Sequence, residues 1–211
     1  MKENLNVKRL MTACSVLLLG LFLASCGGST QLVETWAEPT YKPKPAPKVM
    51  VVALGENERR IKSFEDIFGG YFTARKIETL KGNDLKAISV PDVEAFKKIV
   101  HDSGADLCVI TKLVDITDET VYHPGTTSYV PVTGYYGMGY YYQSSYAMVN
   151  DPGYISTSKV YKVETNVYDV ATEKLVWSGL SKTTDPADFE DGVNSFAAVV
   201  VGDLVTRKLV P

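Results

Sequence analysis

The chain has 211 residues, of which 45% are hydrophobic and 22% charged, and its formal net charge is −3 at pH 7. This length suits one folded domain with a single core. The slight acidic excess argues against nucleic acid as a partner, because binding phosphates requires clustered Lys and Arg.

The start of the chain has the features of a cleaved export signal. Lys2, Lys8 and Arg9 precede a short apolar run at residues 16–23, and small residues stand just before Cys26. A membrane-spanning helix needs roughly 20 apolar residues. The run is too short for that, so we expect residues 1–25 to be removed.

The stretch Leu23-Ala24-Ser25-Cys26 resembles the lipobox of bacterial lipoproteins. The resemblance implies a diacylglyceryl group on the Cys26 sulfur and a fatty acid, such as palmitate, on its new amino group. The next position holds Gly27 and not the Asp that resembles an inner-membrane retention signal. This implies an outer-membrane location, and the domain is expected in the periplasm. The alternative is an ordinary secretory signal with an incidental cysteine.

The mature chain would keep little cysteine chemistry. Removing residues 1–25 takes away three Lys/Arg and one Glu, so the formal net charge changes from −3 to −5. Cys14 is removed with the signal and Cys26 carries lipid, so Cys108 is the one cysteine left and no intrachain disulfide can form. Cys108 lies in an apolar, strand-like run, where a free cysteine behaves as a small buried hydrophobe.

Residues 26–47 are expected to form a lipidated, proline-rich tether. Prolines at 39, 43, 45 and 47 favour extended polyproline II, a semi-rigid spacer of about 3.1 Å per residue. Trp36 and Tyr41 offer an alternative use of this segment as a short peptide ligand.

The first half of the folded domain, which we place at residues 48–211, alternates strands with helices. Apolar runs predict strands at 48–54, 87–90 and 107–116. Three- and four-residue spacing predicts a helix from Ile61 through about Lys76, and another that Pro91 opens and Ser103-Gly104 ends. This order favours an α/β layer.

The second half predicts an antiparallel hairpin and a closing helix. Alternation at residues 162–167 indicates a half-exposed strand, and the turn at 171–174 leads into a second strand at 175–180. Asp185-Pro186 is expected to cap a helix that covers the sheet. The fold class is therefore α/β, a single domain with a mixed sheet flanked by helices.

These elements carry a resemblance to known envelope proteins. The strand at 49–54, the Ser103-Gly104-Ala105-Asp106 turn and the closing hairpin and helix resemble the domain shared by the TolB amino-terminal region, penicillin-binding-protein activator lipoproteins and curli-secretion lipoproteins. The hairpin with Lys174-Leu175-Val176-Trp177, after a Tyr/Gly-rich insert, also resembles uncharacterised envelope lipoproteins. The resemblance implies a structural domain and names no reaction.

The insert, residues 121–161, holds ten of the thirteen tyrosines. Tyr with Gly is a composition enriched at recognition surfaces, and a long loop of this kind is either functional or disordered. A membrane-inserting hairpin, as in the curli-type pore, is a further alternative, but adjacent tyrosines and Pro124, Pro131 and Pro152 count against it. The expected partner-binding residues are Tyr135, Tyr136, Tyr140, Tyr141 and Tyr142.

A catalytic constellation is missing from the sequence. His101 and His123 are the two histidines, and neither belongs to a metal-binding or triad-like motif. Asp115, Asp118 and Glu119 could converge with His123 on a cation, but acidic residues at a strand end are usually solvated. We therefore expect no enzyme activity, no cofactor and no metal.

The sequence thus predicts an outer-membrane lipoprotein, attached to the lipid bilayer through Cys26, that binds or helps to assemble another envelope component, either a protein or a glycan. The alternative is a homo-oligomeric subunit of a curli-type secretion channel.

Overall fold

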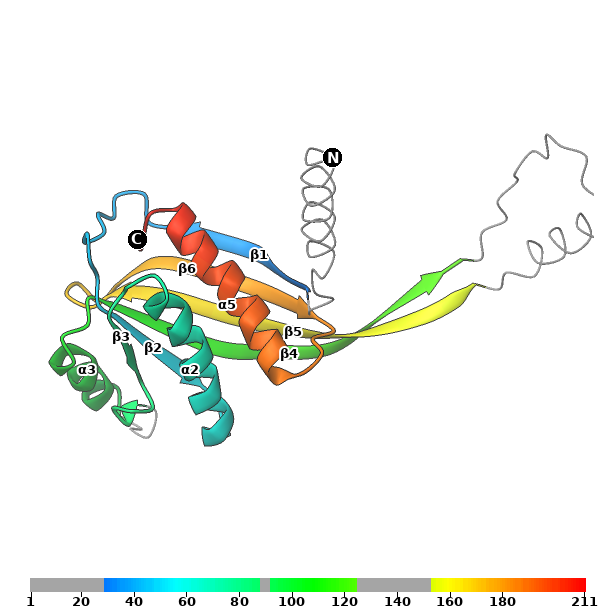
Figure 1. Ribbon diagram of the computed structural model, residues 1–211, viewed down its shortest axis with the longest axis horizontal. Coiled ribbons are helices and arrows are strands. Elements are labelled where there is room, and N and C mark those ends of the chain that lie inside the picture. Colours follow the sequence, from blue (N-terminus) through cyan, green and yellow to red (C-terminus); the bar gives the residue numbers. More distant parts are fainter. Residues whose placement is uncertain (1–28, 88–91, 125–152) are drawn as a thin grey trace, which may run out of the picture.

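The computed structural model describes residues 29–87, 92–124 and 153–211. Within them the chain forms six strands and three helices (Figure 1). In chain order the elements are β1 (Ser29–Ala37), β2 (Val49–Leu54), α2 (Glu58–Thr73), β3 (Thr79–Lys81), α3 (Val93–Asp102), β4 (Leu107–His123), β5 (Tyr154–Asp169), β6 (Lys174–Thr184) and α5 (Phe189–Thr206).

The strands form one mixed sheet in the order β1-β6-β5-β4-β2-β3. Neighbours from β1 to β4 pair antiparallel, whereas β4, β2 and β3 run parallel to one another. The predicted α/β class, the mixed sheet and the closing carboxy-terminal helix are confirmed. The hairpin of β5 and β6 is also confirmed.

The two faces of the sheet are covered differently. Helices α2 and α5 pack together on one face, where Phe68 of α2 and Phe196 of α5 lie 5.1 Å apart in an edge contact above Val51. Helix α3 covers the other face at the β2 end, over Met50 and Cys108. Because β2 has a helix on each side, its residues 49–53 are all buried, as its continuous apolar sequence predicts.

Side-chain caps set the helix starts. Asn57 accepts a hydrogen bond from the backbone N–H of Arg60, and Asp92 accepts from the second and third residues of α3. For α5 the cap is Asp188, which accepts from the N–H of Asp191 at 2.8 Å. The expected cap at Asp185-Pro186 is therefore wrong by three residues.

Residues 29–37 correct the expectation of a free tether. They form β1, which pairs with β6 along its length. The following connection is also bound to the domain: Glu38 N–H donates to the Val176 carbonyl at 3.0 Å, and Tyr41 packs against the main core. The prolines lie after β1, in the connection that packs against the domain. The folded domain therefore already includes Ser29 and does not begin at Lys48.

Two further expectations need correction. The strand that follows α2 is β3 at residues 79–81, which pairs with β2. The strand was expected at 87–90, but Ala87 lies in a 3₁₀ turn and residues 88–90 fall outside the described part of the chain. The insert is also shorter than expected, because β4 continues through His123 and β5 begins at Tyr154.

Candidate functional site

The most distinctive feature of the structure is a two-stranded arm, residues 118–123 of β4 with residues 154–159 of β5. Pairing of β4 with β2 ends at Lys112, and pairing of β5 with β6 ends at Val160. Beyond these points the two strands pair only with each other, as far as His123 opposite Tyr154. Figure 1 shows the arm as a narrow ribbon that leaves the body of the domain.

Charged pairs surround the base of the arm. Lys162 lies 3.1 Å from Asp115, and Lys182 of β6 reaches across β5 to Glu119 at 2.7 Å. Asp185 directly follows β6: its N–H donates to the Lys159 carbonyl at 2.9 Å, and its carboxylate accepts from the Lys159 N–H at 2.6 Å. A hydrogen bond from the Ser158 side chain, more than that backbone bond, lowers the pKa of Asp185.

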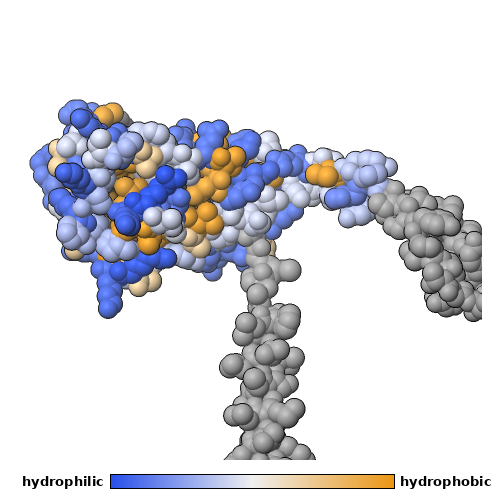
Figure 2. All heavy atoms as spheres, turned by 90° about the horizontal axis from the view of Figure 1, so that it is seen from above, coloured by the Kyte–Doolittle hydropathy of each residue, from blue (hydrophilic) through white to orange (hydrophobic). Residues whose placement is uncertain are grey.

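The far part of the arm carries exposed apolar and aromatic side chains. We call Val121, Tyr122, Tyr154 and Ile155 the tip; they are 50%, 64%, 64% and 67% exposed. The rings of His123 and Tyr154 stack with centroids 4.5 Å apart, and His123 bonds Ser156 at 2.9 Å. Figure 2 shows hydrophobic residues on the arm, separated from those on the body by polar ones.

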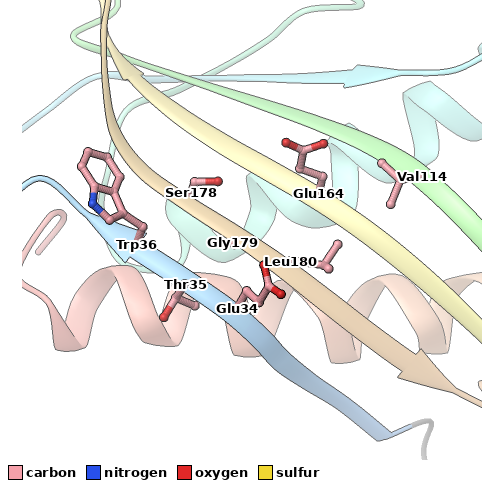
Figure 3. A pocket seen from close by; sticks show the side chains of 8 residues that line it. All are labelled: Glu34, Thr35, Trp36, Val114, Glu164, Ser178, Gly179 and Leu180. Atoms are coloured by element: carbon pink, nitrogen blue, oxygen red, sulfur yellow. The ribbon is translucent and has the colours of Figure 1, made fainter.

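A second feature is a groove on the sheet face opposite α5. Next to β1, no described helix covers this face. Here four strands line an open groove of about 440 Å³. Its lining residues are Glu34, Thr35, Trp36, Val114, Glu164, Ser178, Gly179 and Leu180 (Figure 3). Trp36 is 44% exposed, and Glu164 accepts a hydrogen bond from Asn166 at 3.1 Å. The groove thus offers one aromatic ring and two carboxylates.

The structure does not describe any of the residues expected to carry the lipid or to bind a partner. Cys26 and Tyr135, Tyr136, Tyr140, Tyr141 and Tyr142 lie outside the described residues, so their roles stay predictions. The arm was missed as a structured element, because the exposed strand from Asp115 onward lacks the apolar run that marked the buried part of β4. The sequence signal for the arm was the weak alternation of apolar and polar residues on either side of the tyrosine-rich stretch.

The acidic residues considered as a cation site do not converge. Asp115 and Glu119 each face a lysine, as described above, and His123 bonds a serine. His101 lies 3.1 Å from Glu173, which Lys97 also contacts at 2.7 Å. Among the described residues, no group of three His, Cys, Asp or Glu side chains is arranged to hold a metal ion.

Two titratable groups, Cys108 and Glu65, are buried in the core of the domain. Cys108 is 3% exposed, and burial raises the pKa of its thiol to about 12, which confirms its prediction as a buried hydrophobe. Glu65 of α2 is fully buried and accepts from the backbone N–H groups of Ala53 at 2.9 Å and Asn83 at 2.8 Å. Glu65 therefore fastens α2 to the end of β2.

In the described ranges, no helix is both long and apolar enough to cross a membrane.

The fold and the arm define the chain as a single α/β domain with a mixed sheet and a projecting hairpin. No protein-family model matches the chain, and no curated protein sequence matches it. Solved structures with a similar outline include a PelC dodecamer from Paraburkholderia phytofirmans (15% identity, 84% of this chain, 95% of that chain, TM-score 0.39) and the lipoprotein GNA1162 from Neisseria meningitidis (10%, 77%, 97%, 0.41). A third is a putative neuraminyllactose-binding hemagglutinin homolog from Helicobacter pylori (11%, 82%, 92%, 0.31).

Proposed function

We propose that the protein is an outer-membrane lipoprotein, anchored through Cys26, whose domain acts in the periplasm as a non-catalytic binding or assembly factor for another envelope protein or glycan. The observation that carries this proposal is the arm. Its far end is formed by His123 and Tyr154, so the chain that holds the expected contact residues leaves and re-enters the described structure there.

The physical cost of the arm supports a contact role. An isolated two-stranded ribbon is at best marginally stable in water, and this one leaves large apolar side chains exposed at its tip. Exposed apolar groups that are gathered in one place typically mark an interaction site. The domain core, by contrast, is complete without the arm, because the described core residues lie over the body of the sheet.

The anchor is tested by metabolic labelling with a radioactive fatty acid, followed by membrane flotation. The wild-type chain should carry label and float with membranes, whereas Cys26→Ala should do neither. A labelled Cys26→Ala chain would contradict the assignment. Separation of inner and outer membranes on a density gradient then tests the proposed outer-membrane location.

The contact is tested with two matched triple variants at Tyr140, Tyr141 and Tyr142. Replacement of all three by Ser should abolish the discrete adducts that form when intact cells are cross-linked, because the aromatic contact area is lost. Replacement by Phe keeps the rings and should retain most adducts. Equal adducts in all three proteins would place the contact elsewhere.

A second candidate function, a subunit of an oligomeric secretion channel, is favoured by one specific observation. Along the arm, the outer edges of β4 and β5 have no described partner strand, and such edges are templates for pairing with another chain. Light scattering in mild detergent separates the candidates. A large closed oligomer that collapses when residues 125–152 are replaced by a short turn favours the channel, and a small unchanged mass favours the binding factor.

A further inference from the structure

The amino-terminal end of β1 and the base of the arm lie at the same end of the sheet. Ser29 pairs with Thr184 of β6, Thr184 pairs with Val160 of β5, and Val160 pairs with Thr117 of β4. These residues form one row across four strands, and the arm starts directly beyond this row. Figure 1 shows β1 beginning on the side of the sheet from which the arm departs.

The spacing along the chain keeps this row close to the anchor. Cys26 precedes Ser29 by three residues, which span at most about 10 Å when fully extended. From Ser29 to Thr117 the row crosses three strand spacings, or about 14 Å. The base of the arm is therefore within about 25 Å of the backbone of Cys26, whatever path the connecting residues take.

The tip has the side chains that favour a membrane interface. Tyr rings combine an apolar body with a polar hydroxyl, and they concentrate where one end of a residue is wet and the other apolar. Tyr122 and Ile155 face each other across one side of the arm, and Tyr154 lies on the other side with Val121. All four are at least half exposed, so the tip can bury apolar area on both sides.

The same structure limits how deep the arm can go. Its outer backbone edges pair with no strand in the part of the chain that the structure describes. Unsatisfied backbone groups are costly in the hydrocarbon core, where no water is present to bond them. The acidic and lysine side chains at the base, Asp115, Glu119, Lys162 and Lys182, are paired at the surface and stay in water. The tip therefore suits the headgroup region, with the base above it.

We propose that the tip contacts the interface of the bilayer in which Cys26 is anchored, so that the domain is held at two points and takes a fixed orientation on the membrane. This inference rests on the proposed lipid anchor. A lipid group alone leaves a domain free to rotate about its attachment. A second contact about 20 Å beyond the base, which is six residues of strand, fixes the long axis of the sheet relative to the surface.

The test uses an environment-sensitive probe on the mature lipidated chain. In the proposed lipidated chain the Cys26 thiol is blocked by its lipid, and Cys108 is buried, so a cysteine introduced on the surface is the single site for labelling. Ile155→Cys places a nitrobenzoxadiazole dye at the tip, and Ala171→Cys places it in the exposed β5–β6 turn at the opposite end of the sheet. Both proteins are reconstituted in vesicles of phosphatidylethanolamine and phosphatidylglycerol, with and without a spin-labelled lipid that quenches the dye.

The expected result is a blue-shifted, brighter emission at position 155 that the spin-labelled lipid quenches, and a water-like, unquenched emission at position 171. Water-like emission at both positions in protein that floats with the vesicles overturns the inference but leaves the anchor intact. A bright but unquenched dye at position 155, with a larger mass in detergent, also overturns it and indicates a second copy of the chain on the tip. Protein that does not float overturns the anchor and the inference together.

Discussion

The indole Nε1 of Trp177 donates a 2.8 Å hydrogen bond to Oδ2 of Asp203. Trp177 lies in β6 and is fully buried, and Asp203 lies in α5 and also accepts from Arg207 Nε at 2.6 Å. Because a buried indole N–H needs a partner, this bond fixes where the closing helix crosses the sheet.

Replacing Trp177 by Phe should therefore destabilise the domain. The change removes the hydrogen bond and leaves part of the indole volume empty, for a loss of about 2 kcal/mol in the free energy of unfolding. Trp36→Phe is the matched control, because Trp36 is 44% exposed, and its effect should stay within about 0.5 kcal/mol. Urea denaturation followed by circular dichroism measures both, and equal effects of the two variants would contradict this account.

A glycine in β6 is required by the same tryptophan. A Cβ built on Gly179 would lie 2.3 Å from Cη2 of Trp177 and 2.7 Å from Cζ2, so Gly179→Ala should cost at least about 2 kcal/mol by overpacking. Gly70→Ala is the control, since a Cβ there meets nothing within 4 Å. Gly70 lies inside α2, where Ala is favoured over Gly, and this variant should gain about 0.5–1 kcal/mol. Thermal unfolding measures both variants, and midpoint temperatures that shift in the same direction would refute the steric explanation.

Local sequence could predict those strands and helices in which the pattern of apolar and polar residues matches the pattern of burial. β2 is apolar at every position and is covered on both faces, and β5 and β6 alternate because one face meets α5. β1 was missed because it is an edge strand stabilised by β6, about 150 residues later in the chain, and a register shift after Leu32 breaks its alternation. The arm was missed for a related reason, since its strands have no core face and depend on each other.

Glu65 should make stability depend on pH. Burial raises the pKa of its carboxyl above the ordinary 4.5, against the opposing effect of two backbone N–H donors. The folded state then binds more protons than the unfolded state between these two pKa values, so stability falls as pH rises through this window from about 4.5. Glu65→Gln loses one backbone hydrogen bond at every pH but lacks this titration.

The stability difference between wild type and Glu65→Gln should therefore be largest near pH 4 and should narrow toward pH 7. Urea denaturation at a series of pH values measures it, and all other titrating groups cancel in the comparison. A difference that widens with pH would mean that the two backbone donors outweigh burial and lower the pKa.

Asp106 should show the opposite pH dependence. The Lys44 side chain, together with the Lys48 N–H at 2.8 Å, lowers the pKa of the Asp106 carboxyl below 3.8. The stability from these contacts is present above about pH 3.8 and is lost as pH falls through the lower folded-state pKa. Asp106→Asn should cost about 1 kcal/mol at pH 7 and less at pH 3. Lys44→Met removes the exposed ion pair and keeps the backbone contact, so its smaller loss measures the ion pair, and the rest of the Asp106→Asn loss measures the backbone contact.

Cys108 provides a direct measure of how often the domain opens. Its thiol is buried with a pKa of about 12, so the folded, lipidated chain should have no thiol that reacts quickly with Ellman's reagent at pH 8, and one after addition of guanidinium chloride. Ala171→Cys should add one fast thiol, which controls for reagent access. Reaction through unfolding should speed up about 30-fold in Gly179→Ala if that variant loses about 2 kcal/mol. Fast reaction of Cys108 in the folded wild-type chain would contradict its burial, whereas one extra fast thiol that disappears in Cys26→Ala would show instead that Cys26 carries no lipid.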